Sequence, residues 1–182
     1  MDQFNFGPAS PGEIRIFGAS RPGYPSHSVS GNEVADWLSF MRRKGMERVC
    51  CLLGDSQLAY YEGDLLDTYR DFFGERNVCW APVEDHELCD AETLMKIILP
   101  FLVLTDRDSM QAVVHCSAGI GRTGLVMAAW LIHGREIRRD DALAMVKEAG
   151  RNPYEAVGTD PLKRSKLHAL LDACKDGRGA VQ

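Results

Sequence analysis

The sequence predicts an α/β fold, in which helices cover both faces of a central, mostly parallel sheet of about four to five strands. Two observations predict this class. Segments with strand character alternate four times with segments of helical character, as in sheets whose parallel strands are joined by crossover helices. The 182 residues are 45% hydrophobic and no linker rich in Pro, Gly or Ser divides them, so we expect one domain over residues 1–182, with its core at about 13–175.

The N-terminal part predicts one strand and one helix. Residues 1–12 form an irregular lead, in which two Phe residues are expected to cover an apolar edge. Residues 13–17 alternate in polarity as a strand does, and residues 18–30 are interrupted by Pro and Gly as a loop is. Apolar residues at helical spacing then predict a helix from Asn32, as its N-cap, to Lys44. The buried face of this helix is expected to contain Val34, Trp37, Leu38 and Met41.

The middle of the chain repeats this order. Residues 48–53 are an apolar strand, residues 63–73 a helix, and residues 77–83 a third strand that ends near its proline. A long apolar helix follows over residues 90–105, capped by Asp90 and kinked at its internal proline.

The C-terminal part predicts one more strand and three helices. Residues 112–114 are an apolar strand, and residues 125–132 are an apolar helical run. Two further helices are expected over residues 139–149 and 161–175, because a Gly-Arg-Asn-Pro turn separates them and a proline opens the second.

Composition limits the function classes. The net charge is −5 and the basic residues are scattered, which argues against a nucleic-acid or membrane surface. The longest apolar run, residues 97–104, is too short to span a bilayer, and the polar start is unlike a signal peptide. The six cysteines show no spacing typical of a metal site. We therefore expect reduced thiols, no metal or cofactor, and a cytoplasmic monomer.

The chemistry is concentrated in residues 115–124, His-Cys-Ser-Ala-Gly-Ile-Gly-Arg-Thr-Gly, between a predicted strand and a predicted helix. Its glycines allow a tight loop whose N–H groups turn inward at a helix N-terminus and form an anion-binding nest. Cys116 places a nucleophile at the floor of the nest, and Arg122 supplies a planar, charged fork on its wall. The residues expected to bind phosphate are Ser117, Ala118, Gly119, Ile120, Gly121 and Arg122.

Two other interpretations of this loop compete with phosphate chemistry. Its three glycines also spell G-x-G-x-x-G, but a dinucleotide site needs an acidic residue about 20 positions later, at the end of the next strand. The acids in that window, Asp140 and Asp141, open a helical segment instead. In the second interpretation the glycines only make a turn and Cys116 is a buried thiol. A Cys, an Arg and three glycines in register favour phosphate chemistry over both.

The nest, the helix N-terminus and Arg122 all favour the anionic form of Cys116. The thiolate is expected to attack a bound phosphoryl group and to leave a phosphocysteine that water hydrolyses. The Thr123 hydroxyl can donate a hydrogen bond to the sulfur. His115 precedes the nucleophile and is expected to orient the loop through backbone hydrogen bonds rather than to act as a base.

The leaving oxygen needs a proton from a neighbouring loop at the same edge of the sheet. Residues 82–86, Pro-Val-Glu-Asp-His, follow the third predicted strand as the Cys116 loop follows the fourth. Asp85 is the first candidate for this general acid, and Glu84 and Asp90 are the alternatives.

Residues 115–124 resemble the signature loop of the cysteine-based protein tyrosine phosphatase superfamily. Residues 82–86 resemble the general-acid loop of its compact dual-specificity branch. The resemblance implies a protein tyrosine phosphatase-like fold and a metal-independent hydrolase, with Cys116 as nucleophile, Arg122 as phosphate ligand, Thr123 as assistant and Asp85 as acid. It also implies phosphotyrosine, phosphoserine or phosphothreonine of a phosphoprotein or phosphopeptide as substrate, and phosphate or another oxyanion as a loop ligand.

The sequence departs from the pattern of the classical tyrosine-specific phosphatases, and these departures indicate to which branch of the superfamily it is most similar. The triplet W-P-D is absent, and the prominent Tyr of the phosphotyrosine-recognition loop cannot be placed. Inositol-lipid phosphatases of the superfamily often carry lysines within the signature loop, where this chain has Ala118 and Ile120. Phosphoproteins are therefore expected in preference to phosphoinositides, which stay an alternative. A phospho-ligand binding module without catalysis is the other alternative.

Four further residues keep open roles. Arg21 is expected to be a solvated charge, although it lies in a loop from which it can reach a ligand. Asn152 either positions water or substrate or belongs to an ordinary turn. Cys89 and Cys51 are the candidate partners of Cys116 in a disulfide formed on oxidation.

Overall fold

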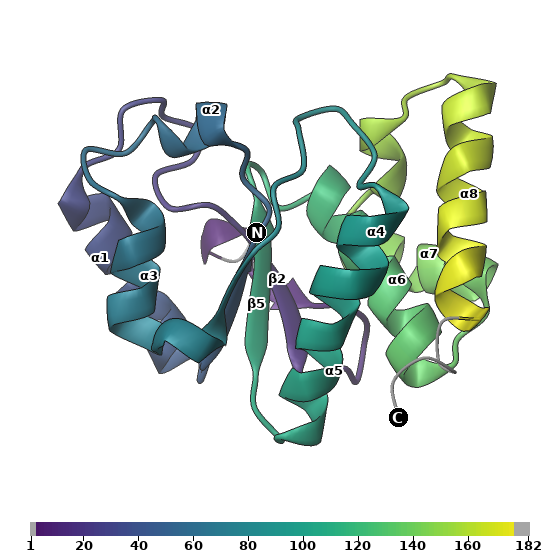
Figure 1. Ribbon diagram of the computed structural model, residues 1–182, viewed down its shortest axis with the longest axis horizontal. Coiled ribbons are helices and arrows are strands. Elements are labelled where there is room, and N and C mark those ends of the chain that lie inside the picture. The colour runs from purple at the N-terminus through teal and green to yellow at the C-terminus, as the bar shows by residue number, and fades with distance from the viewer. Residues whose placement is uncertain (1–2, 177–182) are drawn as a thin grey trace.

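The computed structural model describes residues 3–176, and its centre is a five-stranded sheet with the strand order β1-β2-β5-β3-β4 (Figure 1). The strands are β1 Gly7–Pro8, β2 Ile16–Ser20, β3 Arg48–Cys51, β4 Val78–Trp80 and β5 Ala112–Cys116. β2, β5, β3 and β4 run parallel, and β1 pairs antiparallel with β2. The mostly parallel sheet predicted from the sequence is therefore confirmed.

Helices cover both faces of this sheet, also as predicted. α1 Gly31–Arg43 and α3 Leu65–Phe73 lie on one face, and α5 Leu99–Arg107, α6 Gly121–Arg135, α7 Arg139–Glu148 and α8 Pro161–Asp176 lie on the other (Figure 1). The shorter pieces are η1 Gln3–Asn5, α2 Asp55–Leu58, η2 Glu75–Asn77, α4 Ala91–Thr93, the π-helical η3 Leu94–Ile98 and η4 Pro153–Ala156. Within residues 3–176, no helix is both long enough and apolar enough to cross a membrane.

An apolar core lies on each face of the sheet. The core under α1 and α3 contains the four residues predicted for the buried face of the first helix: Val34, Trp37, Leu38 and Met41. Phe4 and Phe6 pack edge-on against Phe40 of α1, so the N-terminal lead covers an apolar edge as expected. The other core is centred on α6, which is buried from Gly121 to Ile132. Burial on all sides explains why this helix has no polar stripe in its sequence.

The boundaries of β2 differ from the prediction. The strand begins at Ile16 rather than at residue 13, because the Glu13 carboxylate accepts the N–H groups of the next two residues. It continues to Ser20, inside the predicted loop, because its pairing with β5 extends to Cys116. This extension brings the end of β2 beside the loop that follows β5.

The start of α1 also corrects the sequence prediction. Ser30, not Asn32, is the N-cap: its hydroxyl accepts the N–H of Glu33, and the Glu33 carboxylate accepts the N–H of Ser30. This reciprocal capping box satisfies two donors that a helix start would otherwise leave open. Asp90 caps α4 as predicted. The run predicted as one helix is divided into α4, the π-helical η3 and α5, and Pro100 is the second residue of α5, where a proline is tolerated.

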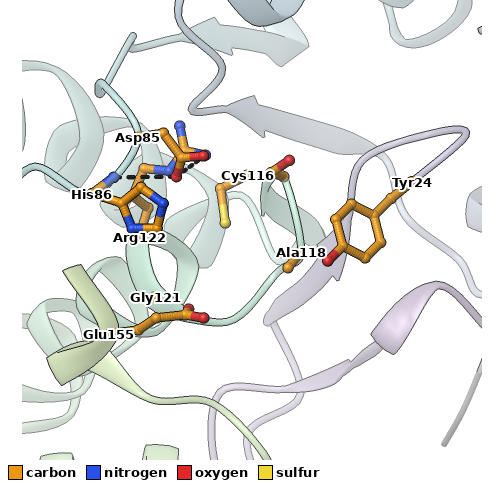
Figure 2. Close-up of a pocket in the computed structure, with 9 residues that line it drawn as sticks. Tyr24, Asp85, His86, Cys116, Ala118, Gly121, Arg122 and Glu155 are labelled. Carbon is orange, nitrogen blue, oxygen red and sulfur yellow. Dashed lines mark hydrogen bonds and ion pairs between the residues drawn. The ribbon is translucent and has the colours of Figure 1, made fainter. Parts of the chain in front are cut away.

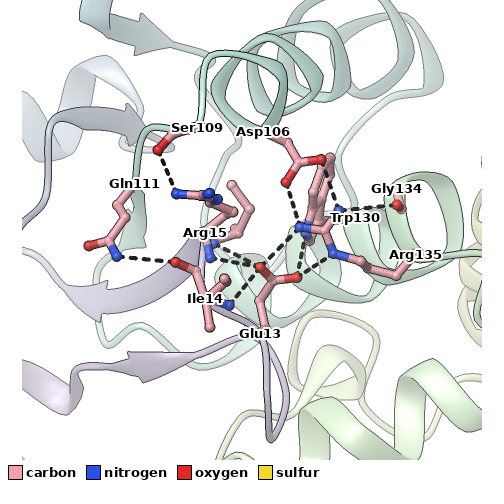
Figure 3. A network of polar contacts seen from close by, with 10 residues as sticks. Glu13, Ile14, Arg15, Asp106, Ser109, Gln111, Trp130, Gly134 and Arg135 are labelled. Carbon is pink, nitrogen blue, oxygen red and sulfur yellow. Dashed lines mark hydrogen bonds and ion pairs between the residues drawn. The ribbon is translucent and has the colours of Figure 1, made fainter.

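A polar network closes the end of the sheet at which the parallel strands begin (Figure 3). The buried Glu13 carboxylate accepts a hydrogen bond from Trp130 Nε1 at 3.1 Å and pairs with Arg135 Nε at 2.9 Å. Arg135 also pairs with Asp106 at 2.7 Å. Although burial raises the pKa of Glu13, the hydrogen bonds from Arg135 and its other donors outweigh burial and hold that pKa below its usual value. The network joins the start of β2 to the end of α6.

Candidate active site

The residues singled out by the sequence meet at the carboxyl ends of the parallel strands, where ligands bind in open α/β sheets. A pocket of about 190 Å³ opens there, above the loop that joins β5 to α6 (Figure 2). Its lining residues are Tyr24, Asp85, His86, Cys116, Ser117, Ala118, Gly121, Arg122 and Glu155. The three residues predicted to carry the chemistry, Cys116, Arg122 and Asp85, therefore line one pocket.

The loop keeps its shape because its carbonyl groups are bound from outside. The backbone N–H of Arg21 donates to the carbonyls of Cys116 and Ser117, at 3.0 Å each, and Asn5 Nδ2 donates to the carbonyl of Ala118 at 3.1 Å. Arg151 Nη1 donates to the carbonyl of Gly119 at 2.8 Å. A tight loop whose carbonyls are held outward presents its N–H groups inward, which is the arrangement of an anion-binding nest.

Gly119 is the residue that this loop needs as a glycine. Its φ is +74°, in the left-handed region, and a Cβ there would lie 2.4 Å from the backbone carbonyl of Ala19 in β2. A side chain at residue 119 would therefore push β2 and the loop apart.

Cys116 ends β5 and is almost completely buried beneath the pocket. The Thr123 hydroxyl donates a hydrogen bond to its sulfur at 3.2 Å. Thr123 is itself buried in the first turn of α6, so the geometry expected from the sequence for this pair is present.

Arg122 is buried, and one of its guanidinium nitrogens is hydrogen-bonded to two acceptors of the protein. Nη1 donates to the carbonyl of Val83 at 2.7 Å and to Gln57 Oε1 at 2.8 Å. Nη2 lies 3.0 Å from Asp85 Oδ1. The fork is therefore locked in one orientation, as recognition of a planar or tetrahedral anion requires.

Gln57 is a site residue that the sequence analysis missed. It lies on the short helix α2, is buried, and accepts from Arg122 while its Nε2 lies 3.5 Å from Asp85 Oδ2. It thus contacts both Arg122 and the candidate acid. No signal in the sequence marked it, because α2 is a single helical turn and a lone Gln is common on protein surfaces.

Asp85 is the candidate acid that the structure brings to the pocket. Its side chain is about half exposed, and it also accepts the N–H of His86 at 3.2 Å. The two alternatives lie elsewhere. The Glu84 carboxylate lies against Gly54 at the start of α2, and the Asp90 carboxylate caps α4.

His115 points away from the pocket, as expected. Its ring packs against Trp37 and Tyr69, and Nε2 lies 3.1 Å from the Tyr69 hydroxyl. The His115 carbonyl accepts the N–H of Leu52, which ties the end of β5 to β3. Burial lowers the pKa of His115 to about 3, so the imidazole is neutral in the folded protein at neutral pH.

The expectation that Arg21 is a solvated charge is wrong. Its side chain is 1% exposed, and Nε donates to the Ser117 hydroxyl at 3.4 Å while Nη1 donates to the carbonyl of Pro22. The guanidinium also lies over the rings of Tyr24 and Tyr60. The sequence does not mark Arg21 as buried, because its partners are mainly backbone carbonyls and tyrosine rings, which leave no charged partner to recognise in the sequence.

Arg151 and Asn152 have different roles although they are adjacent. Arg151 is 1% exposed and binds carbonyls of the Cys116 loop, of β2 and of the N-terminal segment. Burial lowers the pKa of Arg151 to about 10, and the nearby Cys116 works against this shift. Asn152 accepts the N–H of Tyr154 and caps η4. Asn152 is not among the residues that line the pocket, which fits the ordinary-turn interpretation.

Three pocket residues, Tyr24, His86 and Glu155, have no predicted role in the sequence analysis. Tyr24, 48% exposed, forms a wall on the far side of Cys116 from Arg122 (Figure 2). Its place in the loop before α1 explains why no motif marked it. Glu155 comes from η4 and lies near Gly121 (Figure 2).

The two candidate partners of Cys116 for a disulfide are both buried free cysteines. Cys51 lies in β3 and pairs in register with His115, next to Cys116. Cys89 precedes α4. Burial raises the pKa of each thiol to about 12, and the choice between them stays a prediction.

A cysteine and an arginine on one glycine-rich loop, at the carboxyl edge of a mostly parallel sheet, define a phosphate site of the cysteine-phosphatase type. The chain matches the family model "Dual specificity phosphatase, catalytic domain" over residues 65–158, more than half of its length. The chain belongs to this family, and the resemblance stated from its two loops is confirmed.

Curated relatives match over part of their length. Dual specificity protein phosphatase 2 of Homo sapiens is 30% identical over 67 residues, which are 37% of this chain and 21% of that protein. Mitochondrial 3' processome subunit 3 of Trypanosoma brucei brucei is 24% identical over 173 residues, 87% of this chain and 14% of that protein. The first relatives it matches are thus aligned over only about a fifth of their length.

Solved structures share the fold. A mutant form of Tk-PTP is 22% identical with a TM-score of 0.65, covering 93% of this chain and 95% of that one. Kinase associated phosphatase is 19% identical with a TM-score of 0.69, covering 92% and 89%. PTPMT1 in complex with PI(5)P is 12% identical with a TM-score of 0.69, covering 96% and 99%. These neighbours confirm the predicted fold class.

Proposed function

We propose that this chain is a cysteine-dependent phosphatase that hydrolyses phosphotyrosine, and also phosphoserine and phosphothreonine, in proteins. One observation carries the proposal: Cys116, Arg122 and Asp85 line a single pocket, with the arginine held between Gln57 and the acid. A nucleophile, an anion ligand and a proton donor are the three groups that phosphomonoester hydrolysis through a covalent intermediate requires.

In the first step the phosphate binds to Arg122 and to the N–H groups of the loop. The Cys116 thiolate attacks phosphorus, so that an S–P bond forms while the ester P–O bond breaks. Protonated Asp85 gives its proton to the leaving oxygen, which departs as an alcohol or phenol. Arg122 stabilises the charge on the equatorial oxygens in the transition state.

In the second step water attacks the phosphocysteine from the side that the leaving group vacated. The Asp85 carboxylate takes a proton from this water, a new P–O bond forms, and the S–P bond breaks. Inorganic phosphate leaves and the Cys116 thiolate is restored. The hydrogen bond from Thr123 to sulfur, 3.2 Å long, lowers the energy of the departing thiolate.

The lining of the pocket supports a protein substrate rather than a phosphoinositide. Arg122 is the one Lys or Arg among the described lining residues, which include two carboxylates, Asp85 and Glu155. A headgroup with additional phosphates would need additional cations. The Tyr24 ring offers an apolar wall for the aryl group of phosphotyrosine. The bound PI(5)P belongs to the PTPMT1 structure, a neighbour in fold.

The remaining parts of the proposal concern the chain as a whole. We take residues 1–182 as one catalytic domain that acts as a monomer in the cytoplasm, without a metal or cofactor. Sedimentation in the presence and absence of a phosphopeptide would measure the oligomeric state, and a dimer that persists at nanomolar concentration would contradict it.

Turnover of p-nitrophenyl phosphate in the presence of EDTA tests the proposal against a binding module without catalysis. We expect hydrolysis by the natural chain and none by Cys116→Ser, because a serine hydroxyl stays protonated at neutral pH. A natural chain that binds phosphate but turns over neither this ester nor phosphopeptides at any pH would support the binding module instead.

A further inference from the structure

The pocket carries a carboxylate that the two chemical steps leave without a role. Glu155 lies on η4, is exposed, and lines the pocket near Gly121 (Figure 2). Within residues 3–176 no Lys or Arg side chain forms an ion pair with it, whereas Arg122 pairs with Asp85 and Lys163 pairs with Glu87. A phosphate pocket whose rim bears an uncompensated negative charge works against its own dianionic ligand unless that charge serves recognition.

The turn that carries Glu155 is held in place by its surroundings. The Asn152 side chain caps the turn by accepting the N–H of Tyr154. Pro153 packs against Gly124 of α6, where an added Cβ would lie 3.2 Å from the Pro153 nitrogen. Arg151, directly before this turn, is bonded to the phosphate loop through the carbonyl of Gly119. The turn is therefore fixed to the loop that binds phosphate, and Glu155 on this turn lines the pocket.

Other charges near the pocket do not cancel this carboxylate. His86 is exposed, and the buried Arg21 guanidinium is directed toward the Ser117 hydroxyl and the carbonyl of Pro22. The buried Arg151 is directed toward carbonyls of the phosphate loop, β2 and the N-terminal segment. A substrate consequently meets a positive floor, formed by Arg122, and a negative rim.

We propose that Glu155 determines specificity, selecting phosphopeptides with a Lys or Arg next to the phosphorylated residue and discriminating against substrates with a second anionic group. The phosphate of such a peptide binds the floor, and the neighbouring cation pairs with Glu155 at the rim. Complementary charges at two fixed points recognise a zwitterionic ligand and repel a polyanionic one. The inference rests on the proposed function for its choice of a peptide, and a binding measurement tests it separately from turnover.

The experiment measures equilibrium binding of two fluorescent phosphotyrosine peptides to Cys116→Ser, which binds without turnover. The peptides differ at one position beside the phosphotyrosine, which is Arg in one and Glu in the other. The readout is the ratio of their dissociation constants, so any general effect of a substitution on phosphate binding cancels. Glu155→Gln and Glu155→Lys are compared with the matched control Glu148→Gln, an exposed residue of α7 that does not line the pocket.

We expect the Arg peptide to bind more tightly, with a preference that falls about threefold in Glu155→Gln, as suits an exposed charge pair. In Glu155→Lys the preference should reverse, and in Glu148→Gln it should persist. Added salt should reduce the preference for the Arg peptide in the protein that retains Glu155. The preference shown by Glu155→Gln should stay nearly unchanged.

An equal ratio in the Glu155 protein and in Glu155→Gln would overturn the inference. Tighter binding of a short-chain phosphatidylinositol phosphate than of either peptide would also overturn it. If the protein with Cys116 unchanged hydrolyses no phosphate ester, the proposed function is refuted. The ratio of the two dissociation constants would still decide the role of Glu155.

Discussion

The Oδ1 atom of Asp85 lies 3.0 Å from Nη2 of Arg122. The other terminal nitrogen of the guanidinium is already used by the carbonyl of Val83 and by Gln57. The carboxylate therefore lies beside a nitrogen that makes no hydrogen bond of its own, and a bound phosphate competes with Asp85 for this charge. Two anions on one guanidinium repel each other.

Replacing Asp85 by Asn should therefore strengthen the binding of inorganic phosphate. The amide removes a competing negative charge and keeps the shape, so we expect an affinity about fivefold higher, or roughly 1 kcal/mol. Calorimetric titration with phosphate at neutral pH measures it. Glu84→Gln is the matched control, because that carboxylate lies against Gly54. If both variants gain the same affinity for phosphate, the cause is a general charge effect and not competition between Asp85 and phosphate for Arg122.

The same variant should lose turnover in a way that depends on the leaving group. A proton donor matters most when much negative charge develops on the departing oxygen, so phosphoserine peptides need it more than an activated fluorinated aryl phosphate. We expect Asp85→Asn to slow phosphopeptides by about 10²- to 10⁴-fold and the activated ester much less. Values of kcat/KM for the series measure this. An equal loss on every ester would make Asp85 a structural residue.

The elements that decide the site could be predicted because their signals are local. A strand, a glycine-rich loop and an apolar helix follow one another without interruption at residues 112–132, so the place of Cys116 and Arg122 depended on no distant contact. The Asp85 loop was placed by the rule that parallel strands end at the same edge. The structure has both loops around one pocket.

The supporting residues could not be predicted because their roles arise from long-range packing. Gln57 reaches Arg122 across 65 positions of the chain, and Arg151 reaches Gly18 across 133. Arg21 was misjudged for the same reason, since an arginine buried among carbonyls and rings has no sequence signature. Ser30 is different, because a Ser three residues before a Glu is a capping-box pattern that the sequence itself shows.

His115 should make the stability of the protein sensitive to acid. Its pKa is about 3 in the folded protein because of burial, and about 6.5 in the unfolded chain. The unfolded state therefore binds a proton first, so the stabilisation is complete above pH 6.5 and is lost progressively as the pH falls toward 3. Between pH 7 and 4.5 we expect a loss of about 2 kcal/mol from this residue. Urea unfolding at several pH values, compared with His115→Gln, measures it, and parallel curves would contradict the prediction.

Arg151→Lys tests whether a buried guanidinium shapes the phosphate loop. Arg151 donates to the carbonyls of Gly119, Gly18 and two residues of the N-terminal segment. An ammonium keeps the charge but cannot reach this planar set of acceptors. We expect about 2 kcal/mol lower stability, since buried acceptors lose their donors.

The N–H groups around Cys116 should also lose their alignment, so that iodoacetamide modifies this cysteine more slowly at pH 6 and kcat falls. Arg164→Lys, at an exposed residue of α8, is the control. Lower stability with unchanged alkylation and kcat would leave Arg151 a purely structural residue.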